Sequence, residues 1–386
     1  MAINFEFNKD YKRSAYLYEK LYIKFDNFEY LQKILNLNMY LKDYKKVQDI
    51  SFSNINKFKT NEEFIMQNYV FASIQLKEYE KALKVSLSLV KINNSSNNYS
   101  FTADAYYGLK KYKLSSEYYE SAYLKDNNTK SLLNLSNILY GKLNKKADAI
   151  SYLETQILNH NCNKKVCGTL IKYYQEQQNI EGIISISNKM LKNYKLTFTN
   201  TKILKIKNYI LSLYLSLDIK KAIKYLEFEK FDDKKLLAFY GLTNQNKKAL
   251  RLARKLYKRT KDLSLLGQIA IFEYEINPSF SNLKHVFANF EKTLKYKSNA
   301  IYENYYGYIL LNHNIKYKKA LILIKKAYKS NPKNIAYKDS LAYAYYKNKK
   351  YKKAYKIMKE VINITGLKDE EIKQHWNKIK KYKDNK

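Results

Sequence analysis

The hydrophobic and polar positions of this chain repeat about every 34 residues. Each repeat carries a tyrosine, two mostly polar residues and then a small residue, at the start of an amphipathic stretch. Tyrosine occupies the first position of this pattern in six of ten repeats, far more often than chance would place it there. A fixed period of this length is the signature of a helical-repeat protein. The small position falls at Ser14, Val47, Ala82, Ser115, Ala149, Gly182, Ala222, Ala249, Ala320 and Ala354.

The spacing of the small positions is less regular in one part of the chain. Most gaps are 33 to 35 residues, but gaps of 40, 27 and 71 follow one another after Gly182. The gap of 71 spans two repeats, and we assign Ala288 to the poorly marked repeat between them. We therefore expect irregular repeats over residues 195–300.

Each repeat is predicted to form two helices. In the fourth repeat, Ala103, Tyr106 and Leu109 recur at helical spacing, and a second apolar stripe begins at Ser115 after a turn near Lys110. A small residue allows two helix axes to approach closely, because the distance between packed helices depends on side-chain size. One hairpin cannot bury its apolar faces alone, so neighbouring hairpins must stack.

The composition supports an all-α fold. The 386 residues include only 8 Gly and 2 Pro, which is too little turn punctuation for a sheet-rich protein, and the 41 Tyr argue against disorder. We predict an α-α superhelical solenoid of about 10–11 hairpins over residues 1–366. Residues 367–386 are predicted to form a capping helix, with a stripe of Ile372, Trp376 and Ile379, and a charged tail.

Residues 304–361 resemble tandem tetratricopeptide repeats. Ala320, Ala327 and Pro332 stand at the spacing of that family, and the segment DSLAYAYY then opens the next repeat. This tandem is similar to the terminal repeats of bacterial tetratricopeptide proteins, several of which are lipoproteins of the cell envelope. The resemblance implies a scaffold or adaptor that binds a protein or peptide partner, and it leaves the identity of the partner and the oligomeric state open.

The resemblance also implies where a partner would bind. In tetratricopeptide proteins the first helix of each hairpin lines the concave face. Tyrosines on such a face offer a large contact area together with a hydroxyl group, although they also pack between hairpins. The predicted concave-face residues are Asn36, Met39, Asp104, Tyr107, Asn134, Tyr174, Tyr214, Asp339, Tyr343 and Tyr346.

The strong positive charge leaves a second function open. The formal net charge is +37, yet only 4 of the 72 basic residues are Arg. Arginine is better suited than lysine to bidentate phosphate recognition and to stacking on bases, so the lysine excess argues only weakly for nucleic acid. A nucleic-acid-binding helical repeat that uses the lysine-rich surface is the alternative, although no recurring pair of base-reading side chains is present.

The sequence contains no recognisable catalytic or cofactor motif. The patterns GxxxxGK[ST], GxGxxG, GxSxG and HExxH are absent, so we predict a non-enzymatic protein without cofactor or metal site. His160, His285, His313 and His375 are each expected at the surface or in a loop. Cys162 and Cys167 are expected to be free thiols; a disulfide between them needs Cys162 in the loop before the next helix.

The location of the protein is also left open by the sequence. The first residues contain no apolar run, and no stretch approaches the ~18 apolar residues of a membrane span, which favours the cytoplasm. However, Ser14 comes early for a complete first hairpin. A missing upstream signal would instead place the chain in the periplasm or at the outer membrane.

Overall fold

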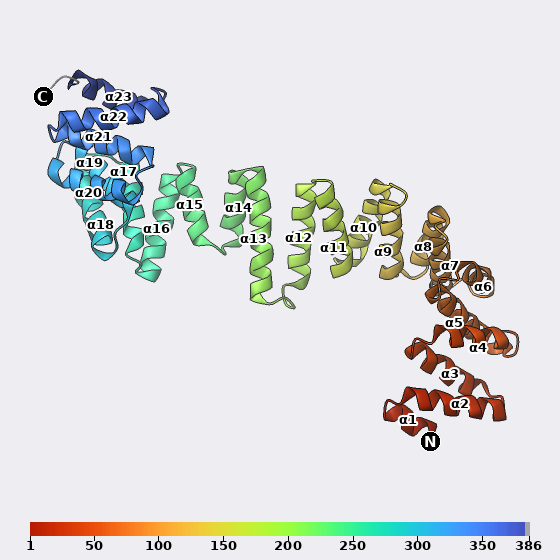
Figure 1. The fold of residues 1–386 in the computed structure, drawn as a ribbon. Helices are drawn as coiled ribbons and strands as arrows, with labels where there is room; N and C mark the ends of the chain where they lie inside the picture. The colour runs from red at the N-terminus through yellow and green to blue at the C-terminus, as the bar shows by residue number, and fades with distance from the viewer. Residues whose placement is uncertain (383–386) are drawn as a thin grey trace. The chain divides into compact units, whose positions relative to one another are not determined.

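The computed structural model describes residues 1–382, and within them it contains 23 α-helices and no strand. Within each of the two compact units described below, most helices that follow one another in the sequence lie side by side in alternating directions (Figure 1). The predicted all-α class is therefore confirmed. The chain forms two compact units, residues 1–210 and residues 211 onward, and the division between them lies inside the segment that was predicted to be irregular.

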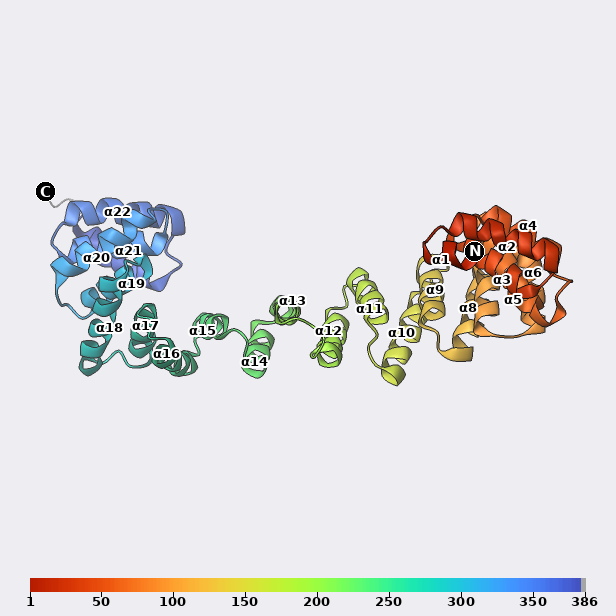
Figure 2. The same ribbon diagram turned by 90° about the horizontal axis from the view of Figure 1, so that it is seen from below.

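The helices form eleven consecutive pairs and one additional helix, which Figure 2 shows from a second direction. The first helices of the pairs are α1 (Ala2–Phe7), α3 (Phe28–Tyr40), α5 (Glu62–Gln75), α7 (Ser96–Gly108), α9 (Thr129–Gly141), α11 (Lys164–Glu176), α13 (Asn200–Leu217), α15 (Asp233–Leu242), α17 (Ser264–Ile276), α19 (Ala300–Asn312) and α21 (Ile335–Lys347). The second helices are α2 (Tyr11–Phe25), α4 (Tyr44–Asn54), α6 (Tyr79–Ile92), α8 (Tyr112–Asp126), α10 (Lys146–His160), α12 (Ile180–Tyr194), α14 (Ile219–Glu229), α16 (Asn246–Thr260), α18 (Leu283–Tyr296), α20 (Tyr317–Ser330) and α22 (Tyr351–Thr365). The additional helix is α23 (Glu370–Ile379), and three short 3₁₀ helices are Lys59–Asn61, Phe280–Asn282 and Lys380–Tyr382.

The repeating small position is the fourth residue of each second helix. It is buried in every pair, and where it is a serine the hydroxyl donates to the backbone of the first helix. Ser14 Oγ lies 3.0 Å from the carbonyl of Ala2, and Ser115 Oγ lies 2.8 Å from that of Ala103. This position is thus the point of closest approach within a hairpin, as helix packing requires.

One of the predicted small positions is wrong, and another stands one residue before the fourth residue of its helix. In α12 the fourth residue is Ile183, which is buried, rather than Gly182; in α18 it is the buried Val286, whereas Ala288 is exposed. The reason lies in the helix starts. The position follows the first residue of the second helix. Ala288 is two residues out of step with that start and is exposed, whereas Gly182 is one residue out of step and still lies against the Tyr174 ring of α11.

The turn inside a hairpin has one recurring form. The residue before the N-cap of the second helix takes a left-handed conformation, and the next backbone N–H bonds back across the end of the first helix, for example from Asp43 to Asn38 at 2.9 Å. This is the Schellman arrangement, in which a left-handed residue satisfies the last carbonyls of a helix. The left-handed residues are Lys9, Lys42, Lys77, Lys110, Asn144, Gln178, Asn244, Asn314 and Lys349. Asn314 differs from the others because it stands two residues before the N-cap Lys316, which is itself left-handed.

The two pairs without this turn explain the irregular spacing. The first helix α13 is 18 residues long, and only Asp218 separates it from α14. Between α17 and α18 the chain instead makes a longer connection that contains Pro278 and a 3₁₀ turn. Both pairs lie within residues 195–300, so altered helix and loop lengths, rather than a different fold, displace the pattern there.

The helix α23 packs against α21 and α22. Ile372 and Ile379 are buried on this side, and the ring of Trp376 lies 5.5 Å from that of Tyr355. The expectation that His375 is a surface or loop residue is wrong, because its side chain is on the same face and is only 4% exposed. The charged tail was predicted to extend to residue 386, and residues 383–386 lie outside the described part of the chain.

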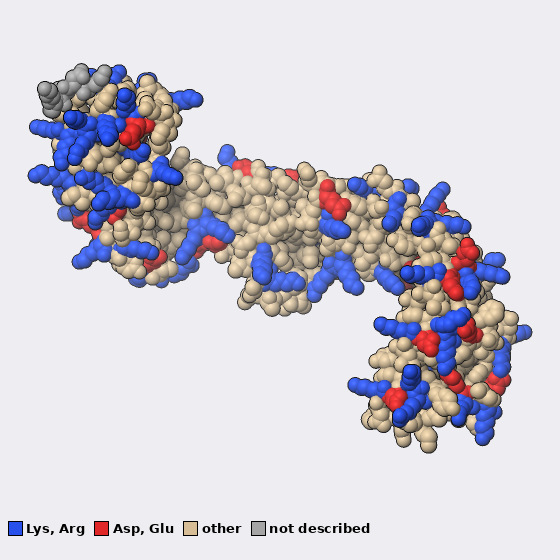
Figure 3. Space-filling model, viewed as in Figure 1, with Lys and Arg blue, Asp and Glu red and all other residues tan. Residues whose placement is uncertain are grey.

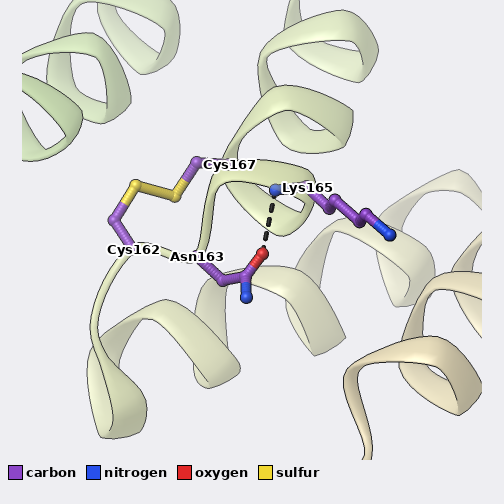
Figure 4. Close-up of a disulfide and its surroundings, with 4 residues drawn as sticks. All are labelled: Cys162, Asn163, Lys165 and Cys167. Atoms are coloured by element: carbon purple, nitrogen blue, oxygen red, sulfur yellow. Dashed lines mark hydrogen bonds between the residues drawn. A yellow bond between two sulfur atoms is a disulfide. The ribbon is translucent and has the colours of Figure 1, made fainter. Parts of the chain in front are cut away.

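Cys162 and Cys167 are joined by a disulfide, which contradicts the expected free thiols (Figure 4). Cys162 lies in the loop between α10 and α11, while Cys167 is in the first turns of α11, and their Cα atoms are 5.8 Å apart. The N-cap residue Asn163 accepts a hydrogen bond from the backbone of Lys165 and so fixes the start of α11. This loop geometry brings together two cysteines that a continuous helix would hold apart.

Candidate functional site

Three predicted site residues come together in unit 1. Asp104 and Tyr107 on α7 and Asn134 on α9 line one cavity of about 290 Å³. Asp104 and Tyr107 lie three residues apart and therefore share one face of α7. Asn134 lies near them because α7 and α9 are the first helices of consecutive hairpins. The cavity is completed by Tyr119, Asn137 and Ile138.

The carboxylate of Asp104 in this cavity is hydrogen-bonded to a tyrosine. The Tyr119 hydroxyl donates to the Asp104 carboxylate. Burial raises the pKa of Asp104 above its ordinary value, although the hydrogen bond from Tyr119 acts in the opposite direction. Burial and the neighbouring carboxylate raise the pKa of Tyr119. Asp104 is thus a partly desolvated acceptor whose cost of burial is offset by one strong hydrogen bond.

A second cavity adjoins the first. Its volume is about 720 Å³, and it shares Asn134 and Asn137 with the smaller one. Lys130 on α9 and Lys164 and Lys165 at the start of α11 stand around it. We call the two cavities together the amide groove, because the two shared asparagines lie at their junction. The groove runs along three consecutive first helices, α7, α9 and α11, all in unit 1.

The amide groove is chemically suited to an extended peptide. An asparagine side chain both donates and accepts hydrogen bonds, as a peptide group does. Asn137 Oδ1 already accepts from the Tyr173 hydroxyl at 2.8 Å, which orients its amide group. The lysines provide positive charge at one end, while Tyr107, which is 43% exposed, provides an aromatic surface at the other.

Three predicted residues are buried in hairpin packing. Tyr174 is 6% exposed, its hydroxyl donates to Glu154, and its ring lies where a side chain at Gly182 would clash. Asp339 and Tyr343 are 6% and 4% exposed and lie beneath α23, next to His375. Little of each of these three side chains is therefore available to contact a protein or peptide partner.

The remaining predicted residues are dispersed. Asn36 is exposed and Met39 is half-buried on α3, away from the amide groove. In unit 2, Tyr214 packs on Tyr225 at 5.2 Å, and Tyr346 packs on Tyr343 at 6.0 Å. The structure therefore gathers only Asp104, Tyr107 and Asn134 into one cavity.

The predicted site set omits most of the other residues that line the groove, among them Asn137 and three lysines. Asn137 could have been found, because it follows Asn134 by three residues on the same helix. Lys130, Lys164 and Lys165 could not, since one of the many lysines on this chain is not distinguishable from another in the sequence. In Figure 3, Lys and Arg side chains appear on both units with Asp and Glu among them, rather than as one continuous stripe. None of the helices within residues 1–382 has the length and apolar character needed to cross a membrane.

Comparison with known proteins gives one match by sequence pattern. A tetratricopeptide-like family model described as anaphase-promoting complex, cyclosome, subunit 3 matches residues 313–372, which span α20 to α22. No curated protein matches the chain. This family match gives no support to the predicted similarity to bacterial cell-envelope proteins, which stays a prediction.

Solved structures with low similarity were also found. The structure of Naa15/Naa10 bound to HypK-THB matches with 14% identity and a TM-score of 0.39, covering 90% of this chain and 66% of that chain. The crystal structure of the APC/C hetero-tetramer Cut9-Hcn1 matches with 11% identity and a TM-score of 0.38, covering 98% of this chain and 94% of that chain. Residues 313–372 thus match a tetratricopeptide-like family model, and tandem helix hairpins make up most of the rest of the described chain.

Proposed function

We propose that this protein is a protein-interaction scaffold that binds an extended peptide segment of a partner in the amide groove. The observation that carries the proposal is the junction of two cavities at Asn134 and Asn137, on the first-helix face of consecutive hairpins. Proteins built from tetratricopeptide-type repeats generally act as interaction scaffolds. A groove that crosses several repeats suits a linear segment better than a small molecule.

The groove favours a particular kind of peptide. The asparagine amides can bond to its backbone, while Lys130, Lys164 and Lys165 favour acidic side chains at the end of the peptide that lies over α11. Tyr107 offers its ring to an apolar or aromatic side chain at the other end. The proposed ligand is therefore a short extended peptide with an aromatic or apolar residue at one end and acidic residues at the other, in either chain direction.

Selection from a random peptide library tests the proposal. The complete chain is immobilised and panned, and selected peptides are titrated against the wild type and against an Asn134→Ala/Asn137→Ala variant. We expect binding to fall about five- to thirtyfold, since the lost hydrogen bonds cost about 1–2 kcal/mol together. Added salt should weaken binding because of the lysine contacts.

A matched variant controls for general damage to the fold. Asn188 is a half-buried asparagine on the second helix α12, outside the groove, and Asn188→Ala should leave peptide binding unchanged. Selected peptides that bind both variants equally well would refute the amide groove as the binding site. Failure to select any peptide, with oligonucleotides bound instead at low salt, would favour the nucleic-acid alternative.

A further inference from the structure

Three side chains that can ligate a metal ion converge in unit 2. Asp339 comes from α21, and Glu371 and His375 come from α23, and their ligand atoms all lie within 4.8 Å of one another. Asp339 and His375 are buried, while Glu371 is exposed. In a chain of net charge +37, two carboxylates and an imidazole at one place form an uncommon local environment.

The distances suit coordination. His375 Nδ1 lies 2.9 Å from Asp339 Oδ2 and 3.1 Å from Asp339 Oδ1. Two ligand atoms that are each about 2.0–2.2 Å from one metal ion lie about 3 Å apart at octahedral angles and about 3.4 Å apart at tetrahedral angles. An ion would displace the proton and lie to one side of the line between Nδ1 and Oδ2, which requires a rotation of the imidazole ring. Glu371 precedes His375 by one helical turn, so both side chains project from the same face of α23.

The surroundings hold the ligands in place. The His375 ring stacks on Tyr343 with centroids 3.9 Å apart and an interplanar angle of 16°. The nearby Asp369 carboxylate is already engaged, because it accepts hydrogen bonds from the backbone N–H groups of Glu371 and Ile372 as the N-cap of α23. The imidazole is therefore oriented toward Asp339, and Asp369 is not needed as a ligand.

A cavity provides access and room for further ligands. Its volume is about 510 Å³, and Asp339 and Glu371 both line it. Asn304 lines the same cavity, and its buried Oδ1 accepts no hydrogen bond from any residue among 1–382. Lys368 also lies on the cavity wall, so net negative charge alone would not retain a cation there. Selection must come from direct coordination by nitrogen and oxygen.

We propose that Asp339, Glu371 and His375 bind a divalent first-row transition-metal ion of the Zn²⁺ type, which links α23 to α21. Imidazole nitrogen favours Zn²⁺ and its neighbours in the series over Mg²⁺ and Ca²⁺, which prefer oxygen ligands alone. Water molecules in the cavity would complete the coordination. The site is on unit 2, separate from the amide groove, and does not depend on the proposed peptide function.

Metal titration of the complete chain tests this site. The protein is stripped with a chelator and titrated with Zn²⁺ by calorimetry and with Co²⁺ by visible absorption, which reports the ligand geometry directly. We expect one tight equivalent, and a thermal midpoint that rises with Zn²⁺ because binding to the folded state stabilises it. Mg²⁺ at the same concentration should produce neither effect.

Two neighbouring glutamates supply the variants. Glu371→Gln removes an exposed ligand without altering the core and should weaken Zn²⁺ binding at least about tenfold. Glu370→Gln is the matched control, since Glu370 is exposed, pairs with Lys373 and lies outside the cluster, and it should bind Zn²⁺ as the wild type does. A second variant, His375→Gln, should abolish the Co²⁺ spectrum, with circular dichroism used to confirm folding.

The outcomes separate a metal site from a structural hydrogen bond. Equal Zn²⁺ affinity in the Glu371→Gln and wild-type chains would overturn the proposal. The proposal would also fail if the stripped wild type showed no Co²⁺ absorption and no Zn²⁺-dependent rise of the thermal midpoint. In that case His375 and Asp339 serve only to hold α23 against α21.

Discussion

Lys319 on α20 forms an ion pair with Glu291 on α18, the second helix of the preceding hairpin, with 2.6 Å between Nζ and Oε1. The buried Tyr306 donates its hydroxyl to the same carboxylate at 2.8 Å. Lys46 pairs in the same way with Glu19, and Lys248 with Glu227. In all three pairs the acidic residue stands five residues after the small position of one hairpin. The lysine stands one residue before the small position of the next hairpin, so the contact is a feature of the repeat.

This contact predicts a graded loss of stability. Glu291→Gln keeps an acceptor for Tyr306 and should lower the free energy of unfolding by about 0.5 kcal/mol, the cost of one exposed ion pair. Glu291→Met also leaves the buried Tyr306 hydroxyl without this acceptor and should cost about 1–2 kcal/mol. Urea unfolding measures both, with the exposed Lys318→Met as a control that should change little. Equal effects of the two Glu291 variants would show that Tyr306 gains nothing from the carboxylate.

Two glycines should respond in opposite directions to alanine. A Cβ added at Gly307 would stand 2.6 Å from Ile324 Cγ1 and 3.0 Å from the backbone oxygen of Ala320, so Gly307→Ala should destabilise the protein by about 1–3 kcal/mol. At Gly168 nothing lies within 4 Å of an added Cβ, and the residue is inside α11. Gly168→Ala should therefore stabilise by up to about 1 kcal/mol through helix propensity. Thermal unfolding that shifts in the same direction for both would contradict the close approach of α19 and α20.

The small position can be tested where the sequence misled us. Val286 is fully buried at the hairpin interface, and Val286→Ala should cost about 1–3 kcal/mol through the cavity it leaves. Ala288→Leu should be nearly neutral, because Ala288 faces solvent. Denaturant midpoints compare the two. A large loss for Ala288→Leu with none for Val286→Ala would restore the assignment made from sequence.

Buried tyrosines predict a loss of stability at high pH. Burial raises the pKa of Tyr306 and of Tyr343 to about 12. The unfolded chain loses these protons near pH 10, while the folded chain keeps them to about 12, so the stabilisation is complete below pH 10 and is lost progressively above it. Unfolding free energies at pH 9, 10 and 11 should decline, and the decline should be smaller in Tyr306→Phe than in the wild type. Parallel pH profiles of the two proteins would argue against this contribution of Tyr306.

The disulfide predicts a chemical and an energetic result. Alkylation under denaturing conditions should modify neither Cys162 nor Cys167 until a reductant is added. Reduction, or the double change Cys162→Ser/Cys167→Ser, should lower stability by about 2 kcal/mol, a small effect because the closed loop is short. Two alkylated cysteines in protein taken directly from its source would show that the bridge does not form there, as expected in a reducing compartment.

Much of the architecture could be predicted from the sequence, because a period of about 34 residues records the packing of each hairpin on the next. The same pattern could not fix the start of α18, which follows a longer loop, and this is why Val286 was missed; in α12 the neighbouring Gly182 was assigned instead of Ile183. The buried state of His375 depends on α23 folding back over Asp339, and no local pattern around His375 records that contact. Likewise, the shared position of Asp104, Tyr107 and Asn134 could be predicted from their register on the first helices. The position of the lysines in the groove depends on how α11 packs beside α9.

The left-handed residue at the hairpin turns has a consequence for how such a chain can change. Nine turns use the same backbone conformation with Lys, Asn or Gln instead of glycine. The same turn recurs about every 34 residues along most of the chain. If one 34-residue repeat were duplicated or deleted, the helices on either side would therefore still be joined by a turn of this kind. The number of hairpins could therefore increase by duplication or decrease by deletion of a repeat, with no change in the type of turn between helices.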